Sequence, residues 1–148
     1  HFAGKGPYLK KYTKIADKLV KAGILRHTPC FGFYNAEELK ALTRKAYLYI
    51  HCALIEVEGL SCAEAVMEGV VPVIAEGRLI ATPQFALDER SLFPVSDSRA
   101  LAERIDWWIE HPEERMAMGK RYVESIRKFN AEDSTRQIIQ MYKDSIAR

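Results

Sequence analysis

The sequence has few cysteines, and their positions give them no obvious structural role. Among 148 residues there are three, Cys30, Cys52 and Cys62. An odd number without a close pair argues against a disulfide framework, and the spacing does not match a zinc-binding pattern. We interpret them as buried free thiols in a reducing compartment. No metal site and no other cofactor is predicted.

An excess of one charge and long apolar runs are also lacking. The 22 basic and 20 acidic residues give a net charge of +2 and are interspersed, without the basic stripe typical of nucleic-acid binding. No apolar run approaches the roughly 20 residues of a membrane span, and no signal or transit segment is visible. We predict a cytoplasmic protein, allowing for peripheral membrane contact of the full-length form, with no nucleic-acid partner.

Helical periodicity and short apolar runs alternate along the chain. We expect helices over about 7–22, 35–47, 60–68, 98–109, 112–126 and 133–146, and strands or extended runs near 30–31, 48–53, 70–75 and 92–95. Asn35 followed by Glu38 fits a capping box at the start of the second helix, and Pro94 argues against a central position for the last strand. The 48–53 and 70–75 runs are continuously apolar, which is typical of a parallel sheet covered on both faces. The fold class predicted is therefore α/β, a Rossmann-like doubly wound parallel sheet forming one domain over residues 1–148.

The helical spacing also predicts which side chains face the core. The apolar residues assigned to inward faces include Tyr8, Tyr12, Ile15, Leu19, Leu101, Ile105, Trp108, Ile109, Met116, Tyr122, Ile126, Ile138, Ile139, Tyr142 and Ile146. His51 lies in an expected strand, where a histidine with its hydrogen bonds satisfied in the core is the commoner case. The lone G-x-G at residues 4–6 is interpreted as a plain turn.

Residues 56–75, with the sequence EVEGLSCAEAVMEGVVPVIA, hold the strongest functional signal. A glycine turn leads into a short apolar helix that stops at Gly69 and is followed by a buried strand. The free N–H groups and the dipole at a helix N-terminus suit a phosphate or pyrophosphate. In a doubly wound sheet this turn lies at the carboxyl edge of the strands, where ligands bind.

Three acidic residues lie in or beside this turn. Ser61 followed by Glu64 fits the S-x-x-E capping box, but a carboxylate in the first helical turn also suits the vicinal hydroxyls of a ribose. Glu56 follows an apolar run, so its carboxylate faces either water or a ligand. Glu58 is interpreted as a solvated loop residue.

The register of this stretch resembles the E-x7-E region of retaining glycosyltransferases with the GT-B fold, the family-4 or "glycosyl transferases group 1" type. Those proteins carry E-x-F-G-L-x-x-x-E-A-x-x-x-G-x-P-V-I, and residues 56–74 here read EVEGLSCAEAVMEGVVPVI. The G-x-G-P at residues 4–7 and Phe31-Gly32 followed by Glu38-Leu39 also match the family pattern. Position 58 departs from it, because Glu58 replaces the usual aromatic residue. The resemblance covers nearly the whole chain.

The resemblance implies a role for each matching residue in a nucleotide-sugar site. Glu56 would act at the reaction centre beside the sugar, and Glu64 would hold the ribose. The remaining sugar-donor contacts would come from the backbone of Gly59, Leu60 and Ser61 at the diphosphate and from Gly32 and Phe33 beside the base. The substrate would be a UDP- or GDP-linked sugar, transferred with retention to an unknown glycan or lipid acceptor.

The resemblance also implies that these residues form most of the donor-binding half of a GT-B fold, without its first strand and helix. The acceptor-binding N-terminal domain of the same chain, and the basic residues that hold the diphosphate, would precede His1. We therefore expect the 148 residues to be inactive alone. Two other classes stay open: a sugar-nucleotide epimerase-like domain, which needs different acid and base residues, and a non-catalytic α/β regulatory or binding module.

Overall fold

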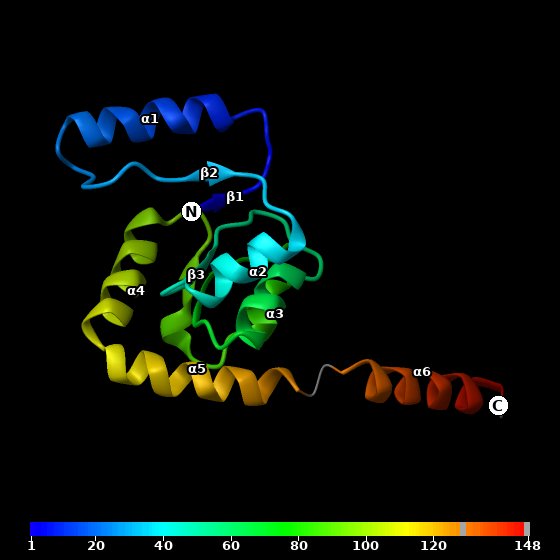
Figure 1. Cartoon of the computed structure of the whole chain (residues 1–148). Coiled ribbons are helices and arrows are strands. Elements are labelled where there is room, and N and C mark those ends of the chain that lie inside the picture. Colours follow the sequence, from blue (N-terminus) through cyan, green and yellow to red (C-terminus); the bar gives the residue numbers. More distant parts are fainter. Residues whose placement is uncertain (128–129, 147–148) are drawn as a thin grey trace. The chain divides into compact units, whose positions relative to one another are not determined.

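The computed structural model of the protein describes residues 1–127 and 130–146. It divides into two compact units, His1–Leu42 and Thr43–Arg148. Every strand pairing within either unit is parallel, and helices connect the strands (Figure 1). The predicted α/β class with parallel sheets is confirmed.

The first unit is a small β-α-β arrangement. Strands β1 (Phe2–Ala3) and β2 (Phe31–Gly32) pair side by side, and helix α1 (Leu9–Lys21) connects them (Figure 1). Gly23 follows α1 with a φ of 72°, the left-handed conformation that ends a helix and that glycine adopts without a steric penalty. Its position confirms the predicted end of this helix.

Helix α2 (Ala36–Arg44) begins at a capping box, as the sequence predicted. The Asn35 side chain accepts a hydrogen bond from the Glu38 N–H at 3.0 Å, and the Glu38 carboxylate accepts one from the Asn35 N–H at 2.9 Å. The helix ends at Arg44, three residues before the predicted end. The Tyr49 N–H already donates to the Val71 carbonyl, so the chain must become extended before that residue.

The second unit is built on a three-stranded sheet in the order β3-β4-β5. Its strands are β3 (Tyr49–His51), β4 (Pro72–Glu76) and β5 (Leu92–Pro94). The central β4 is buried except at its last residue. Strand β5 lies at the edge, as Pro94 predicted, because proline cannot donate a hydrogen bond to a further strand.

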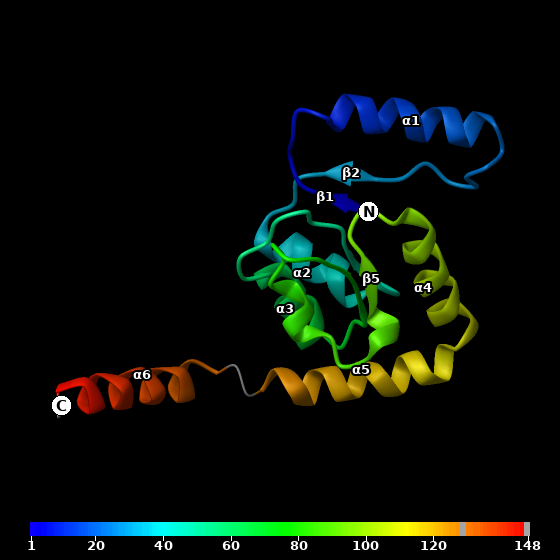
Figure 2. The same ribbon diagram turned by 180° about the vertical axis from the view of Figure 1, so that it is seen from behind.

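Three helices and two short 3₁₀ helices complete the packed part of this unit (Figure 2). They are α3 (Leu60–Met67), η1 (Thr82–Phe85), η2 (Glu89–Ser91), α4 (Ser98–Glu110) and α5 (Pro112–Ile126). The Asp97 side chain caps α4 by accepting hydrogen bonds from the N–H groups of Arg99 and Ala100. Gly69 and Gly119 let α5 approach closely, since a Cβ on Gly119 would lie 2.4 Å from the Gly69 carbonyl oxygen.

The hydrophobic core gathers around β4. Its largest fully buried side chains are Trp108 and Tyr122, as predicted for both. Their polar atoms are also satisfied: the Trp108 indole N–H donates to the Arg90 carbonyl at 3.2 Å, and the Tyr122 hydroxyl donates to Ser91 Oγ at 3.1 Å. This core fixes the strands whose ends carry the candidate site.

Several predicted core faces are wrong. Ala16 is the buried hydrophobic residue of the first unit, and the exposed residues include Tyr8, Tyr12, Ile15, Ile109, Met116, Ile138, Ile139, Tyr142 and Ile146. Helix α6 (Ala131–Ile146) has no buried residue in its described length. Periodicity predicts that a helix has an apolar face but does not supply the element that would cover it.

The prediction that the cysteines are buried free thiols is correct about their being free but only partly correct about their burial. All three thiols are free, but only Cys62 is buried, whereas Cys30 and Cys52 are exposed. Burial raises the pKa of the Cys62 thiol to about 12, so its place near the start of α3 does not activate it. Within the described ranges, no helix is both long and apolar enough to cross a membrane.

Candidate functional site

The loop between β3 and α3 carries Glu56 and is fixed by its backbone. The Glu56 N–H donates to the Leu79 carbonyl at 2.9 Å, and its carbonyl accepts from the Ala81 N–H at 2.8 Å. These two bonds make a parallel bridge between Glu56 and Ile80. The loop therefore extends the sheet beyond the carboxyl ends of its strands, and Glu56 has a defined position there.

The Glu56 carboxylate bends back onto its own loop. Its Oε1 accepts hydrogen bonds from the N–H groups of Val57 at 3.0 Å and Glu58 at 3.4 Å. Hydrogen bonds from the backbone of Gly59 and Glu58 lower the pKa of this carboxyl below its ordinary value. Glu56 is thus an anion at neutral pH whose orientation is set by main-chain groups.

Gly59 is required by both its conformation and its surroundings. Its φ is 74°, and a Cβ built there would lie 2.9 Å from Thr82 Oγ1. Thr82 is fully buried, and Gln84 next along η1 donates to the Glu58 carbonyl at 3.3 Å. The glycine turn is therefore closely packed against η1, and α3 can begin immediately after it.

The predicted capping box at Ser61 and Glu64 is wrong. Gly59 is the N-cap of α3, so Ser61 lies inside the first turn and Glu64 in the second. The Ser61 hydroxyl instead contacts the Tyr49 hydroxyl at 2.8 Å. Glu64 and Leu60 are both exposed, so the Glu64 carboxylate does not serve as a cap and is open to solvent.

His51 lies beside this loop and was misinterpreted as a satisfied core residue. Its Nδ1 is 3.1 Å from the Tyr49 hydroxyl, and its Nε2 is 3.5 Å from Glu56 Oε2. The buried Nε2 has no hydrogen-bond partner. Burial lowers the pKa of His51, against the opposing effect of the Glu56 charge, so the ring is neutral at pH 7.

The remaining predicted residues, Gly32 and Phe33, belong to the first unit. Phe33 is exposed, and the ammonium of Lys5 lies 4.0 Å from the centre of its ring. A Cβ on Gly32 would lie 3.1 Å from the Tyr34 ring. The structure thus brings Glu56, Gly59, Leu60, Ser61 and Glu64 together in one unit and places the predicted base-side pair in the other.

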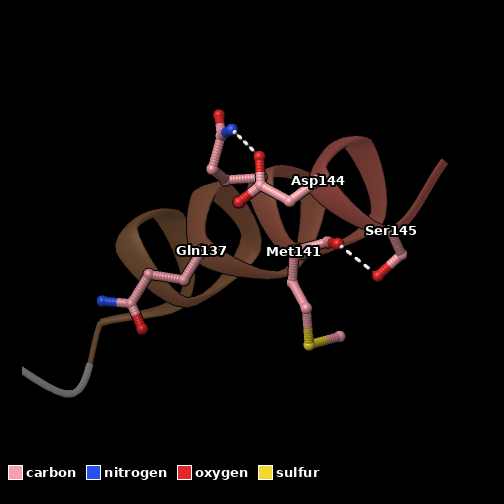
Figure 3. A pocket seen from close by; sticks show the side chains of 5 residues that line it. Gln137, Met141, Asp144 and Ser145 are labelled. Atoms are coloured by element: carbon pink, nitrogen blue, oxygen red, sulfur yellow. Dashed lines mark hydrogen bonds between the residues drawn. The ribbon is translucent and has the colours of Figure 1, made fainter. Parts of the chain in front are cut away.

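The structure also has a pocket on α6, which lies far along the sequence from the candidate site residues described above. It is lined by Gln137, Gln140, Met141, Asp144 and Ser145, whose internal hydrogen bonds are Gln140 to Asp144 and Ser145 to the Met141 carbonyl (Figure 3). All five lie on one exposed helix, so this pocket is a groove on the surface of α6. No cluster of His, Cys, Asp or Glu suited to a metal ion occurs among the described residues.

The sequence interpretation missed Tyr49 and His51 as members of the site. Residues two apart on a strand point to the same face, so Tyr49 and His51 could have been predicted to lie together. The contact of Tyr49 with Ser61 depends on the packing of α3 against β3, and no local pattern indicates it.

Comparisons with known proteins agree with this arrangement. The family model "Glycosyl transferases group 1" matches residues 1–124. A solved structure, the catalytic domain of cholesterol-alpha-glucosyltransferase from Helicobacter pylori, is 42% identical, with a TM-score of 0.78 over 86% of this chain and 77% of that one. A search of curated proteins found no significant match. The fold is that of one half of a GT-B glycosyltransferase, and the chain belongs to the glycosyl transferases group 1 family.

Proposed function

We propose that this chain binds the sugar donor in a retaining glycosyltransferase that uses a nucleotide-diphosphate sugar. The observation that carries the proposal is the Glu56 carboxylate, held by loop N–H groups immediately before the start of α3. Glu64 lies eight residues later on that helix. One short segment therefore presents an oriented anion, a helix N-terminus and a second, exposed carboxylate.

In this proposal Glu56 orients the sugar at the reaction centre. Its lowered pKa keeps it ionised near neutral pH, so it accepts hydrogen bonds from sugar hydroxyls rather than donating a proton. A carboxylate fixed by main-chain groups needs little reorganisation as the reaction proceeds. The proposed retention requires no protein nucleophile in this chain.

The diphosphate would lie at the N-terminus of α3. The first turn of this helix contains no acidic residue, so its free N–H groups and dipole are available to an anion. The nucleoside diphosphate is the leaving group, and these groups would stabilise the negative charge that develops on it. Glu64 would accept hydrogen bonds from the ribose hydroxyls, and Gly32 and Phe33 would border the base.

For the acceptor, we propose a lipid rather than a glycan. The similar Helicobacter pylori protein is named for the glucosylation of cholesterol. Around Glu56 this chain also exposes apolar side chains, namely Leu54, Ile55, Val57, Leu60 and Leu79. Such a border suits an apolar molecule or a second, acceptor-binding domain of the same protein. The 148 residues alone are expected not to transfer sugar.

A transfer assay with the intact natural protein tests the proposal. UDP- and GDP-sugars are supplied with lipid acceptors, and turnover is compared between the natural protein, Glu56→Gln and Glu110→Gln. We expect Glu56→Gln to reduce kcat/KM by about 10²-fold or more, as for a lost transition-state contact. Glu110, exposed at the end of α4, is the matched control and should change little. Equal activity of Glu56→Gln and the natural protein would refute the assignment.

A further inference from the structure

A line of side chains connects the start of α3 with the Glu56 carboxylate. It runs from Ser61 Oγ to the Tyr49 hydroxyl at 2.8 Å, and from that hydroxyl to His51 Nδ1 at 3.1 Å. The other ring nitrogen, Nε2, then lies 3.5 Å from Glu56 Oε2. The side chain of His51 is only 10% exposed and that of Glu56 is 30% exposed. Ser61 is exposed as well, so the line reaches solvent at both ends and is most buried at His51.

The proton positions along this line follow from its chemistry. The Tyr49 hydroxyl stays protonated, since burial raises its pKa to about 12, and the hydrogen bond with Ser61 acts in the opposite direction. Either hydroxyl can donate in the contact between Ser61 and Tyr49, and His51 Nδ1 can accept from Tyr49 or donate to it. The ionised Glu56 carboxylate near Nε2 can only accept, so it favours the form of the ring in which Nε2 carries the proton and Tyr49 donates to Nδ1. A neutral imidazole that accepts at Nδ1 carries its proton on Nε2, which is the nitrogen that faces Glu56.

We propose that His51 is a positioning residue that holds the Glu56 carboxylate in register with the start of α3, through Tyr49 and Ser61. The inference rests on the proposed function, in which Glu56 lies beside the sugar and Ser61 beside the diphosphate. The Oε1 atom of Glu56 is engaged by loop N–H groups, and Nε2–H of His51 directs Oε2. The carboxylate is thus constrained from both sides.

The burial of Nε2 gives this contact its strength. A buried N–H without an acceptor is costly, and Nε2 has no hydrogen-bond partner in the structure. The elements packed against β3 are α3 and β4. The titratable groups on these two elements are the buried, uncharged thiol of Cys62 and the exposed carboxylates of Glu64 and Glu76. Glu56 is the acid within ion-pair distance of the ring, so closing the 3.5 Å gap is the way in which His51 satisfies its proton.

A double-mutant cycle in the intact natural protein tests the coupling. We expect His51→Phe to lower kcat about tenfold while the Kd for free UDP or GDP changes less than about twofold, because the Glu56 carboxylate that His51 directs faces the sugar in the proposed function and free UDP or GDP carries no sugar beyond the ribose. His51→Gln keeps a side-chain N–H and should recover part of the loss. In a Glu56→Gln background, His51→Phe should cost less than about twofold further. Full additivity of the two losses, or unchanged kcat in His51→Phe, would overturn the inference.

A second readout is independent of sugar transfer. Nitrogen-15 NMR of the His51 imidazole in the same protein, without substrate, reports which nitrogen carries the proton. We expect the neutral Nε2–H form at pH 7, and a shift toward a mixture of the two neutral forms in Tyr49→Phe. A predominant Nδ1–H form would overturn the inference. If the natural protein binds and transfers no sugar nucleotide, the proposed function fails, while the NMR result still decides the orientation of His51 toward Glu56.

Discussion

The two units of the chain differ in how deeply they are packed. In the first unit the paired strands are two residues long, and Ala16 is its buried hydrophobic residue. The second unit surrounds a buried central strand with a core that includes Trp108 and Tyr122. Burial of apolar area is the main source of stability, so we expect the two units to differ strongly in their sensitivity to substitution.

The candidate site residues follow the same division. Glu56 and Gly59 are fixed by main-chain hydrogen bonds and by contact with η1, whereas Phe33 stands exposed on a loop. The second unit therefore holds its candidate residues in a more defined position than the first unit does.

The largest expected effect comes from removing a core side chain. Trp108→Ala should destabilise the second unit by about 3–5 kcal/mol, since it leaves a cavity and an unpaired carbonyl at Arg90. Ile15→Ala in α1 should cost less than about 1 kcal/mol, because this side chain is already exposed. Native-state hydrogen exchange measures the two units separately. Similar losses from both substitutions would remove the contrast between the units.

A comparison of Gly59 with Gly23 separates the cost of a packing clash from the cost of backbone strain. Gly59 and Gly23 have φ values of 74° and 72°, so an alanine at either carries a similar left-handed penalty of about 1–2 kcal/mol. A Cβ at Gly59 would lie 2.9 Å from Thr82 Oγ1, whereas a Cβ at Gly23 would meet no neighbouring atom. Gly59→Ala should therefore cost about 1–2 kcal/mol more than Gly23→Ala. Thermal unfolding of both variants checks the difference, and equal costs would show that the η1 contact is relaxed in solution.

A smaller effect concerns pH. The pKa of His51 is lowered by burial, so below about pH 6.5 the unfolded chain binds a proton before the folded one. The stability of the second unit should fall as pH decreases from 6.5 toward the folded pKa of His51. His51→Phe should flatten this part of the profile. Glu56, whose pKa is also lowered, loses its contribution only at more acidic pH. Denaturant unfolding at a series of pH values distinguishes the pH range in which His51 loses its contribution to stability from the more acidic range in which Glu56 does.

The smallest effect is expected at a solvated ion pair. Arg99 and Glu103 lie 3.4 Å apart on α4, with exposed fractions of 90% and 65%. Pairs of this kind contribute less than about 0.5 kcal/mol. Arg99→Ala should leave the unfolding midpoint nearly unchanged, and a loss above 1 kcal/mol would show that surface charge supports the second unit more than its core suggests.

Two similar sequence patterns show how far local reasoning reaches. Asn35 and Glu38 form the predicted capping box, but Ser61 and Glu64, at the same spacing, do not. The difference is Gly59, whose left-handed conformation starts α3 two residues before Ser61. Gly59 is also packed so closely against Thr82, which comes from a segment more than twenty residues away, that a Cβ there would lie 2.9 Å from Thr82 Oγ1. The sequence patterns did predict where helices and parallel strands occur, because both kinds of element follow from the periodicity of apolar residues.

The predictions that were wrong concern side chains whose contacts depend on residues distant in the sequence. The apolar faces of α1 and α6 were predicted to be buried, but nothing in their sequences specifies a covering element. His51 was predicted to be satisfied in the core, and its unpaired Nε2 becomes visible only when Glu56 is placed beside it. In the candidate site, the motif register located Glu56 and Glu64, while the tertiary structure was needed to find Tyr49 and His51.

Calorimetric titration of the intact natural protein with UDP, GDP and their sugars examines the sugar-donor site itself. We predict that one nucleotide class binds and that Glu64→Ala weakens its binding by about 1–3 kcal/mol, through the lost charge-assisted hydrogen bonds to the ribose. Glu110→Ala should bind as the natural protein does. Equal binding of every nucleotide by the natural protein and by Glu64→Ala would contradict the assignment of this segment as the sugar-donor site.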